Sequence, residues 1–289
     1  MLARGIYPAS ITPMRGGELD VASLMGLLEW FIESGCAGAV LAGTNGEGPS
    51  LGIREKKRLV REASRSGLTL IIGVNTSAAE DAIATLCEAA EEDAQAGLVM
   101  PPSYFREAVD AGLERWYTRV LDGSPIPLLA YNLPARTGVS VSYELLRRLG
   151  PHERLAGIKD SSGEVANLAG YAEALSGLEK SLFVGNELLL RAALEAGWSG
   201  SISGAANVIG AELVRAMRAW QGPDADAAFG LADRALKLLR GPAQPGANKA
   251  LLALMGRIAS DEVAPPLAAF DSAAARKLLA DLDSAAISA

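Results

Sequence analysis

Hydrophobic residues along the chain fall into short, nearly uninterrupted runs that alternate with longer stretches of helical periodicity. Runs that are apolar throughout, rather than at every second position, are typical of parallel strands covered on both faces. The amphipathic stretches between them, such as VASLMGLLEWFIESG, end at a glycine as helices commonly do. The eight predicted strands cover residues 5–12, 37–43, 68–75, 96–102, 126–133, 155–162, 181–187 and 199–206.

Eight strand–helix units in this order predict an α/β fold of the (β/α)8 TIM barrel type. We expect the barrel to span residues 1–224 as the catalytic domain, and residues 225–289 to form a C-terminal helical appendage. A doubly wound sheet is the alternative. It normally carries a Gly-rich G-x-G-x-x-G turn after its first strand, whereas this strand runs into ITPM.

Composition and charge exclude several classes of protein. The net charge is −7, which argues against a nucleic-acid surface. No stretch approaches the roughly 20 apolar residues of a membrane span, and the chain starts without an apolar signal core, so we expect a cytoplasmic protein without a membrane partner. The single histidine, His152, sits in a polar turn, which excludes a Ser-His-Asp triad and a multi-histidine metal site. No metal and no cofactor are predicted.

Lys159 ends the apolar run LAGIK and is followed at once by a polar turn. The carboxyl ends of barrel strands carry the chemistry in this architecture. Burial disfavours the ammonium form, so a lysine there offers a neutral amine that can attack a ketone and form a Schiff base. The alternative is a purely structural lysine, paired with Asp160 or Glu187.

Two other strand ends carry polar groups next to this lysine in the predicted barrel. Tyr131 ends the preceding strand, and its hydroxyl can shuttle protons; the alternative is a core aromatic with a hydrogen-bonded hydroxyl. The turn GTNGEG, residues 43–48, can offer backbone N–H groups to an anion such as a carboxylate. Gly-rich turns of this kind are common, so this turn is a weak signal by itself.

Taken together, the segments SITPM, GTNGE, PPSYF, YNLPARTG and GIKDSSG resemble the dihydrodipicolinate synthase and N-acetylneuraminate lyase family of pyruvate-dependent class I aldolases. The resemblance covers essentially the whole chain. It implies a barrel with a C-terminal helical domain, assembled as a homotetramer that is a dimer of dimers. The implied substrates are a small 2-oxo acid and an aldehyde.

The resemblance also implies catalytic roles for four residues. Lys159 would form the Schiff base with pyruvate or another 2-oxo acid, and Tyr131 would be the general acid and base. Thr44 would link Tyr131 by hydrogen bonds to Tyr104, which in this family reaches across from the neighbouring subunit.

Substrate binding is implied for a second set. Thr44 and Asn45 would hold the carboxylate of the 2-oxo acid, while Ile202 and Ser203 would line the pyruvate pocket. Arg136 would bind the carboxylate of the second substrate in the synthase branch. A guanidinium buried there and left unpaired would penalise an aldehyde that carries only hydroxyls.

Departures from the family pattern keep three functions open. Asn45 replaces the second threonine of the synthase turn, whereas Arg136 favours a synthase that condenses pyruvate with aspartate semialdehyde. The second possibility is an aldolase or dehydratase acting on a 2-oxo-3-deoxy sugar acid. The third is a barrel that only senses a 2-oxo acid, against which the set of Lys159, Tyr131 and Thr44 argues. Because Ile53 and Ser103 stand where regulated synthases bind lysine through rings and hydroxyls, we expect no feedback inhibition by lysine.

Overall fold

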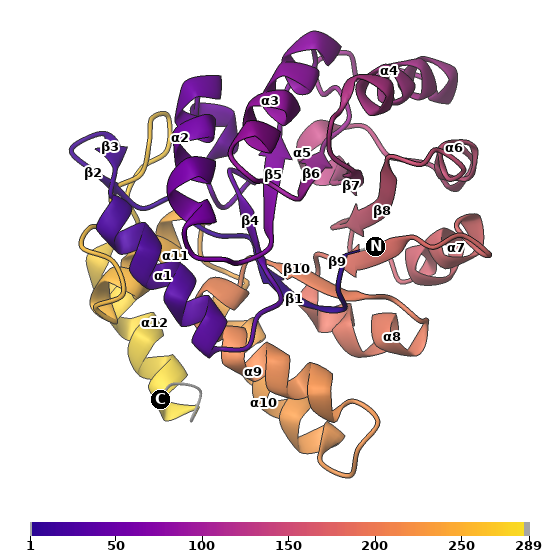
Figure 1. Cartoon of the computed structure of the whole chain (residues 1–289). Coiled ribbons are helices and arrows are strands. Elements are labelled where there is room, and N and C mark those ends of the chain that lie inside the picture. The colour runs from indigo at the N-terminus through magenta and orange to yellow at the C-terminus, as the bar shows by residue number, and fades with distance from the viewer. Residues whose placement is uncertain (1, 286–289) are drawn as a thin grey trace.

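The computed structural model describes residues 2–285, in which all eight predicted strands form one parallel sheet (Figure 1). Their order around the sheet is β1-β10-β9-β8-β7-β6-β5-β4. Ala9, just past β1, bridges Val40 of β4 in parallel, and the amide of Ser10 donates to the Val40 carbonyl at 2.9 Å, which closes the sheet into a barrel. The barrel strands are β1 (Gly5–Pro8), β4 (Ala39–Leu41), β5 (Leu70–Val74), β6 (Ala96–Val99), β7 (Leu128–Asn132), β8 (Leu155–Asp160), β9 (Ser181–Val184) and β10 (Gly200–Ser203).

Helices surround the barrel on its outside, as Figure 1 shows. The surrounding elements are α1 (Val21–Glu33), η1 (Gly48–Ser50), α2 (Ile53–Ser64), α3 (Ala79–Glu91), α4 (Asp110–Gly123), α5 (Pro134–Thr137), α6 (Tyr143–Leu149), α7 (Ala166–Ala174), η2 (Glu187–Leu189), α8 (Leu190–Glu195) and α9 (Ala206–Ala219). Three further helices follow, and they pack against α9 and one another: α10 (Ala225–Leu239), α11 (Gly246–Leu254) and α12 (Ser272–Ser284). The predicted barrel and helical C-terminus are thus confirmed. The last predicted helix extends to residue 286, which lies outside the described residues.

One element was not predicted, a short antiparallel hairpin between the first strand and the first helix. Its strands are β2 (Met14–Arg15) and β3 (Glu18–Leu19). Gly16 and Gly17 form the turn with φ of 62° and 79°, the left-handed backbone that glycine adopts without steric cost. A Gly-Gly pair between short runs is a recognised hairpin signal, but two-residue strands are too short to show an alternating pattern.

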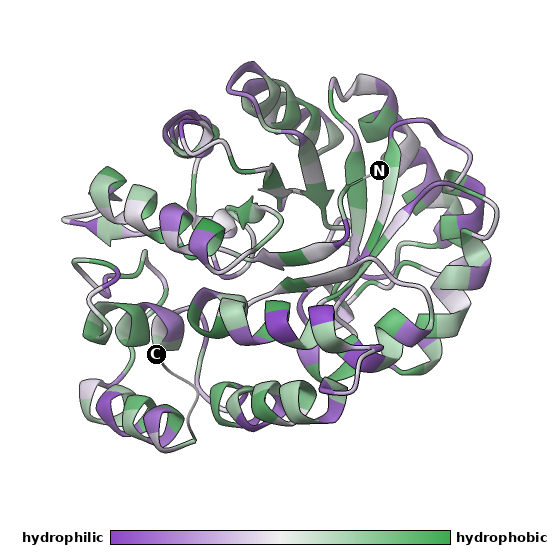
Figure 2. Ribbon diagram, turned by 60° about the horizontal axis from the view of Figure 1, so that its bottom comes forward, coloured by the Kyte–Doolittle hydropathy of each residue, from purple (hydrophilic) through white to green (hydrophobic). Residues whose placement is uncertain are grey.

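Two layers of hydrophobic side chains hold the barrel together. Inside it, Tyr7, Phe183 and Ile202 are fully or almost fully buried, and Tyr7 meets Phe183 edge-on with ring centroids 5.2 Å apart. A larger cluster fills the space between strands and helices. Figure 2 shows the result as largely hydrophobic strands at the centre and helices that carry both hydrophobic and hydrophilic residues. Chains of this kind expose the carboxyl ends of the strands as a rim for polar residues.

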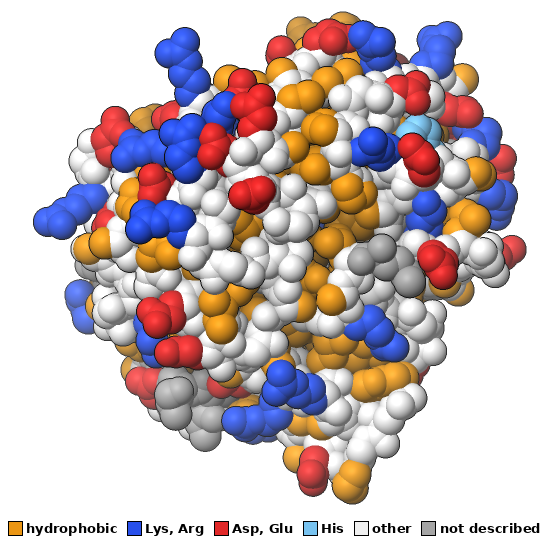
Figure 3. Space-filling view, viewed as in Figure 1, with side chains coloured by type: hydrophobic (Ala, Val, Ile, Leu, Met, Phe, Trp, Pro, Cys, Tyr) orange, Lys and Arg blue, Asp and Glu red, His pale blue; other side chains and the backbone are white. Residues whose placement is uncertain are grey.

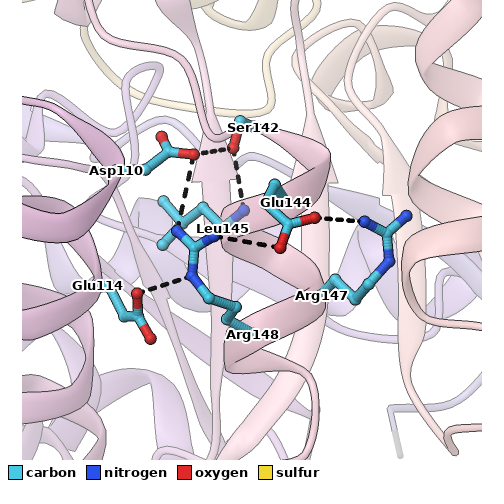
Figure 4. A network of polar contacts seen from close by, with 7 residues as sticks. All are labelled: Asp110, Glu114, Ser142, Glu144, Leu145, Arg147 and Arg148. Atoms are coloured by element: carbon cyan, nitrogen blue, oxygen red, sulfur yellow. Dashed lines mark hydrogen bonds and ion pairs between the residues drawn. The ribbon is translucent and has the colours of Figure 1, made fainter.

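Charged side chains brace α4 against α6 on the outside of the barrel (Figure 4). Arg148 of α6 reaches Glu114 of α4 at 2.7 Å and Glu144 of its own helix at 3.3 Å. Ser142 caps α6 by accepting the Leu145 amide at 3.0 Å, and its hydroxyl also donates to Asp110. This network lies on the helical shell, and Val141 next to it donates its amide to Asn132 at the end of β7 at 3.0 Å.

Candidate active site

Lys159 lies on β8, flanked by Tyr131 of β7 and Phe183 of β9 in direct register. Its side chain is only 5% exposed. The ammonium nitrogen Nζ sits 4.3 Å from the centre of the Tyr131 ring, and Tyr131 is 4% exposed. Side chains at equivalent positions on neighbouring parallel strands point to the same face, which brings the amine and the phenol together. The predicted neighbourhood of Lys159 and Tyr131 is therefore present.

Neither carboxylate offered as an ion-pair partner for Lys159 plays that part. The Asp160 carboxylate accepts hydrogen bonds from Asn132 at 2.7 Å and from the Ser162 hydroxyl at 2.8 Å. Glu187 accepts the Ser203 hydroxyl at 2.6 Å. Within residues 2–285, no carboxylate oxygen comes within 4.0 Å of the Lys159 amine. The interpretation of Lys159 as a salt-bridged structural lysine is wrong for these two partners.

Gly185, directly after β9, gives Lys159 room beside its side chain. A methyl group at this position would lie 1.8 Å from the Ser161 hydroxyl and 3.0 Å from Cε of Lys159. Any larger residue would therefore clash first with Ser161 and also press on the Lys159 side chain. Glycine is favoured here by the close approach of Ser161 and Lys159 rather than by its own backbone angles.

A cavity of about 210 Å³ opens next to this glycine. Its polar lining comes from the segments that follow β4 and β9 and from the segment just after the C-terminus of α10. The members are Asn45, Asn186, Glu187, Arg240 and Gln244. A wider hollow of about 840 Å³ lies between α9 and α10 and contains none of the predicted site residues. Lys159 and Tyr131 do not line the smaller cavity themselves, but Gly185 on its wall lies against the Lys159 side chain, which makes this cavity the candidate for substrate.

The turn after β4 brings the predicted carboxylate binders to this cavity. Ala42 before it has φ of 50°, and Glu47 at its end has φ of 58°, both left-handed and unusual for side-chain-bearing residues. Thr44 and Asn45 lie between them and are half-buried. Asn45 lines the cavity, and its Oδ1 is buried without a hydrogen-bond partner among the described residues. An amide left incomplete in this way is typical of a binding site.

The two remaining candidates, Ile202 and Ser203, lie on β10, the last strand of the barrel. Ile202 is fully buried among the side chains inside the barrel. Ser203 is also fully buried. Its hydroxyl donates to Glu187 at 2.6 Å and accepts the amide of Ala206 at 2.9 Å. Neither residue lines the cavity, whose lining after this strand continues at Gly204 instead.

Two predicted residues lie apart from this group in the single chain. Tyr104 is 82% exposed and contacts Phe105, with ring centroids 5.2 Å apart. Within the described chain no hydrogen bond joins Thr44 to Tyr131 or Tyr104, so the predicted relay stays a prediction. Arg136, on α5, is exposed; its amide donates to the Leu133 carbonyl at 3.0 Å, while its guanidinium has neither an ion pair nor a hydrogen bond among residues 2–285. The expectation of a buried guanidinium is wrong for the single chain, because α5 is a single surface turn.

Three features of the site were missed from the sequence. Gly185 and Asn186 lie at the end of the predicted strand 181–187 but were given no role, because only the fold shows which strand ends face the lysine. Lys249 is fully buried and pairs with Glu47 at 2.5 Å. The sequence does contain a feature that could have identified Lys249: it is a lone lysine within the apolar helical pattern of ANKALLALM.

The surface and the remaining titratable groups suggest no other centre. Figure 3 shows acidic and basic side chains interspersed over the face in view. His152 lies near the surface, with Nε2 3.2 Å from Asp122, as expected of a loop histidine. Among the described residues, no group of three or more histidine, cysteine, aspartate or glutamate side chains is placed to hold a metal ion. No helix in residues 2–285 is both long and apolar enough to cross a membrane.

Comparison with known proteins agrees with this geometry. The model of the dihydrodipicolinate synthetase family matches residues 2–285. The chain belongs to this family. A 4-hydroxy-tetrahydrodipicolinate synthase of Syntrophobacter fumaroxidans is 30% identical over 285 residues, covering 96% of this chain and 97% of that protein.

Solved structures of family members share the whole fold. The 4-hydroxy-tetrahydrodipicolinate synthase of Methylacidiphilum fumariolicum SolV superposes with a TM-score of 0.91 at 28% identity, covering 98% of this chain and 96% of that one. YagE, a prophage protein of the same family from E. coli K12 solved in complex with pyruvate, gives 0.93 at 25% identity, with 99% and 100% covered. The predicted family, barrel fold and class of enzyme, a synthase-like class I lyase, are confirmed.

Proposed function

We propose that this enzyme forms a Schiff base between Lys159 and pyruvate or a closely related 2-oxo acid, and joins the resulting enamine to an aldehyde. The observation that carries the proposal is a buried lysine amine that lies beside a phenol and has no carboxylate partner among residues 2–285, with Gly185 between its side chain and a cavity of about 210 Å³.

The chemistry needs only groups of this chain and the two substrates. The neutral Lys159 amine attacks the C2 carbonyl of the 2-oxo acid, and the carbinolamine loses water to give the Schiff base. Loss of a C3 proton gives the enamine, whose C3 attacks the aldehyde carbon to form the new C–C bond. In this proposal Tyr131 donates and accepts the protons of these steps, and Thr44 positions its hydroxyl in the proposed relay to Tyr104.

The carboxylate of the 2-oxo acid is proposed to bind at the turn after β4. Thr44 and Asn45 supply backbone N–H groups and side-chain donors there, and Asn45 lines the cavity. Ile202 and Ser203 do not line the cavity; Ser203 supports the pocket through its hydrogen bond to Glu187, which does line it, and Ile202 packs inside the barrel. In this proposal Thr44 and Asn45 fix C2 within reach of Lys159.

Aspartate semialdehyde is the proposed second substrate, with Arg136 binding its carboxylate. Full-length relatives at about 30% identity carry the name 4-hydroxy-tetrahydrodipicolinate synthase, which supports this choice. The exposed guanidinium of Arg136 has no other partner among the described residues, so it is free to bind an anion.

A sugar-acid aldolase or dehydratase is the second candidate, favoured by one observation. The cavity beside Lys159 is lined by Asn186 and Glu187 rather than by Arg136. A carboxylate and an amide accept hydrogen bonds from hydroxyl groups, whereas Glu187 repels a second carboxylate.

The two candidates are separated by kcat/KM for pyruvate with aspartate semialdehyde against kcat/KM for cleavage of 2-oxo-3-deoxygluconate. We expect the wild type to prefer the condensation, and Arg136→Ala to lower that value about tenfold or more, the scale of a lost charge-assisted hydrogen bond. Preference for the sugar acid, with no change in Arg136→Ala, contradicts the synthase proposal and supports the second candidate.

We propose further that the enzyme is a cytoplasmic homotetramer built as a dimer of dimers, with the catalytic barrel in residues 1–224 and the helical domain in 225–289. The 82% exposure of Tyr104 supports a partner subunit at this loop, because an aromatic ring so exposed is costly in water. Phe105 beside it is 67% exposed.

A further inference from the structure

A fully buried ion pair connects the C-terminal helices to the turn that carries Thr44 and Asn45. Nζ of Lys249, on α11, lies 2.5 Å from Oε1 of Glu47, and both side chains have no exposed surface. Burial lowers the pKa of Lys249, while the nearby Glu47 carboxylate acts in the opposite direction. Two charges taken out of water are no more stabilising than apolar side chains of the same volume. The pair therefore needs an explanation beyond packing.

The Glu47 carboxylate uses both of its oxygens to bind the C-terminal part of the chain. Oε1 pairs with Lys249, and Oε2 accepts the backbone amide of Ala264 at 2.6 Å. Lys249 in turn donates to the carbonyl of Glu262 at 2.5 Å. One carboxylate thus joins α11 and the segment 262–264 to the end of the turn.

The backbone of Glu47 depends on this anchoring. Its φ of 58° is left-handed, a conformation that costs free energy for a residue with a Cβ. In that conformation its amide donates to the Thr44 carbonyl at 3.3 Å, which closes the turn around Asn45 and Gly46. Thr12 holds the same turn from the other side through a 2.7 Å hydrogen bond to the Gly46 carbonyl. A fixed side chain at Glu47 therefore fixes the backbone that presents Thr44 and Asn45.

We propose that Lys249 and Glu47 are positioning residues for substrate binding: they hold the turn of residues 43–48 in the shape that binds the carboxylate of a 2-oxo acid. This inference rests on the proposed function, because it assumes that Thr44 and Asn45 bind that carboxylate. Neither positioning residue lines the cavity among the described residues. Their loss should weaken binding of pyruvate and leave the reactivity of bound pyruvate toward Lys159 intact.

Glu47→Gln tests the proposal because glutamine has a single acceptor oxygen for two donors. Either Lys249 or the Ala264 amide must lose its partner. We expect the pyruvate concentration that half-saturates borohydride trapping to rise roughly tenfold, the scale of one lost hydrogen bond to a charge. The amount of adduct at saturating pyruvate should stay at the wild-type level.

Glu92→Gln is the matched control. Its carboxylate also accepts two hydrogen bonds, from Nε and Nη2 of Arg61 at 3.1 and 2.6 Å, but it does so on the exposed surface between α2 and α3. We expect half-saturation in this variant to stay within about twofold of the wild type, well under the tenfold change that one lost hydrogen bond produces. A Glu47→Gln variant that matches the wild type equally well overturns the proposal.

Two measurements distinguish a loss of positioning from a variant that simply fails to fold. The double variant Glu47→Gln with Lys249→Met buries no uncompensated charge, and we expect it to fold and to show the same raised half-saturation. In the wild type, pyruvate should slow amide hydrogen exchange at residues 44–48 and at Ala264 together. Slowing at 44–48 alone overturns the coupling even if no variant folds. If the wild type traps no pyruvate at all, the proposed function fails instead.

Discussion

The contact between Lys159 and Tyr131 is set by strand register, and it was predictable to the level of single residues. An apolar run that ends near a tyrosine, followed on the next strand by one that ends near a lysine, places both at one rim of a parallel barrel. Roles that depend on loops were not predictable in the same way. Arg136 is exposed on α5, and the sequence contains no feature that distinguishes a surface turn from a lid.

Tyr131→Phe tests proton transfer at this scale. We expect kcat to fall by about 10²- to 10⁴-fold, the usual effect of losing a general acid and base, while the fold is kept. Steady-state kinetics with circular dichroism of both proteins gives the measurement.

Tyr7→Phe is its control inside the same barrel. Burial raises the pKa of Tyr7 to about 12, and its hydroxyl donates to the Ala3 carbonyl at the opposite end of the strand. The rate should change less than about twofold, because no proton-transfer group is lost. Equal losses in both variants would mean that Tyr131 only packs the core.

At the scale of elements, unbroken apolar runs predicted all eight strands, while the exact bounds came from contacts that the sequence does not show. The first run was expected to continue to residue 12, but β1 ends at Pro8 and only Ala9 bridges beyond it. The eighth run was expected to reach residue 206, where α9 already begins. In both places the chain leaves the sheet to build the rim, so the same residues that end the strands form the site.

Helix α6 offers a stability test that leaves the site untouched. Ser142 accepts the Leu145 amide at 3.0 Å as the helix N-cap (Figure 4). Ser142→Ala should lower the free energy of unfolding by about 1 kcal/mol, the typical value of such a cap. Denaturant unfolding measures the loss, and kcat should stay unchanged because α6 lies on the outer shell. Ser142→Thr keeps an acceptor oxygen and should recover most of the stability; if it does not, the cap is not the cause.

The whole molecule links its two parts through Glu47 and Lys249, a contact that joins positions about two hundred residues apart in sequence. Sequence patterns predicted the helices on which such contacts lie, since α10 to α12 follow plain amphipathic periods. Which lysine of these helices faces the barrel could not be predicted, because burial depends on packing between distant segments.

Assembly is tested by complementation between two inactive chains. If Tyr104 acts in the site of a neighbouring subunit, Tyr104→Phe and Lys159→Ala should each lose most activity, while mixed oligomers regain part of it. The mixture contains sites that combine an intact Lys159 with a Tyr104 from the other chain. Sedimentation of the wild type should show a tetramer. A fully active monomer, or mixtures no better than either parent, would contradict the shared site.

Regulation gives a second test at this scale. Ile53 begins α2 with an apolar side chain, and Ser103 is short, so neither supplies a ring to a bound lysine. We expect kcat/KM to be unaffected by millimolar lysine. Strong inhibition at sub-millimolar lysine in a standard condensation assay would show that Ile53 and Ser103 do not mark the site at which regulated synthases bind lysine.

The central claim is that Lys159 is the residue that bonds to the 2-oxo acid. Incubation with pyruvate and borohydride, followed by peptide mass analysis, should find one reduced pyruvyl group per chain, on the peptide that contains Lys159. Lys180 is a suitable internal comparison, because its amine is occupied by the carbonyls of His152 and Leu155 at 2.9 and 2.6 Å. Lys159→Ala should give no adduct at any pyruvate concentration. An adduct on another lysine of the wild type, or trapping that persists in Lys159→Ala, would contradict the account.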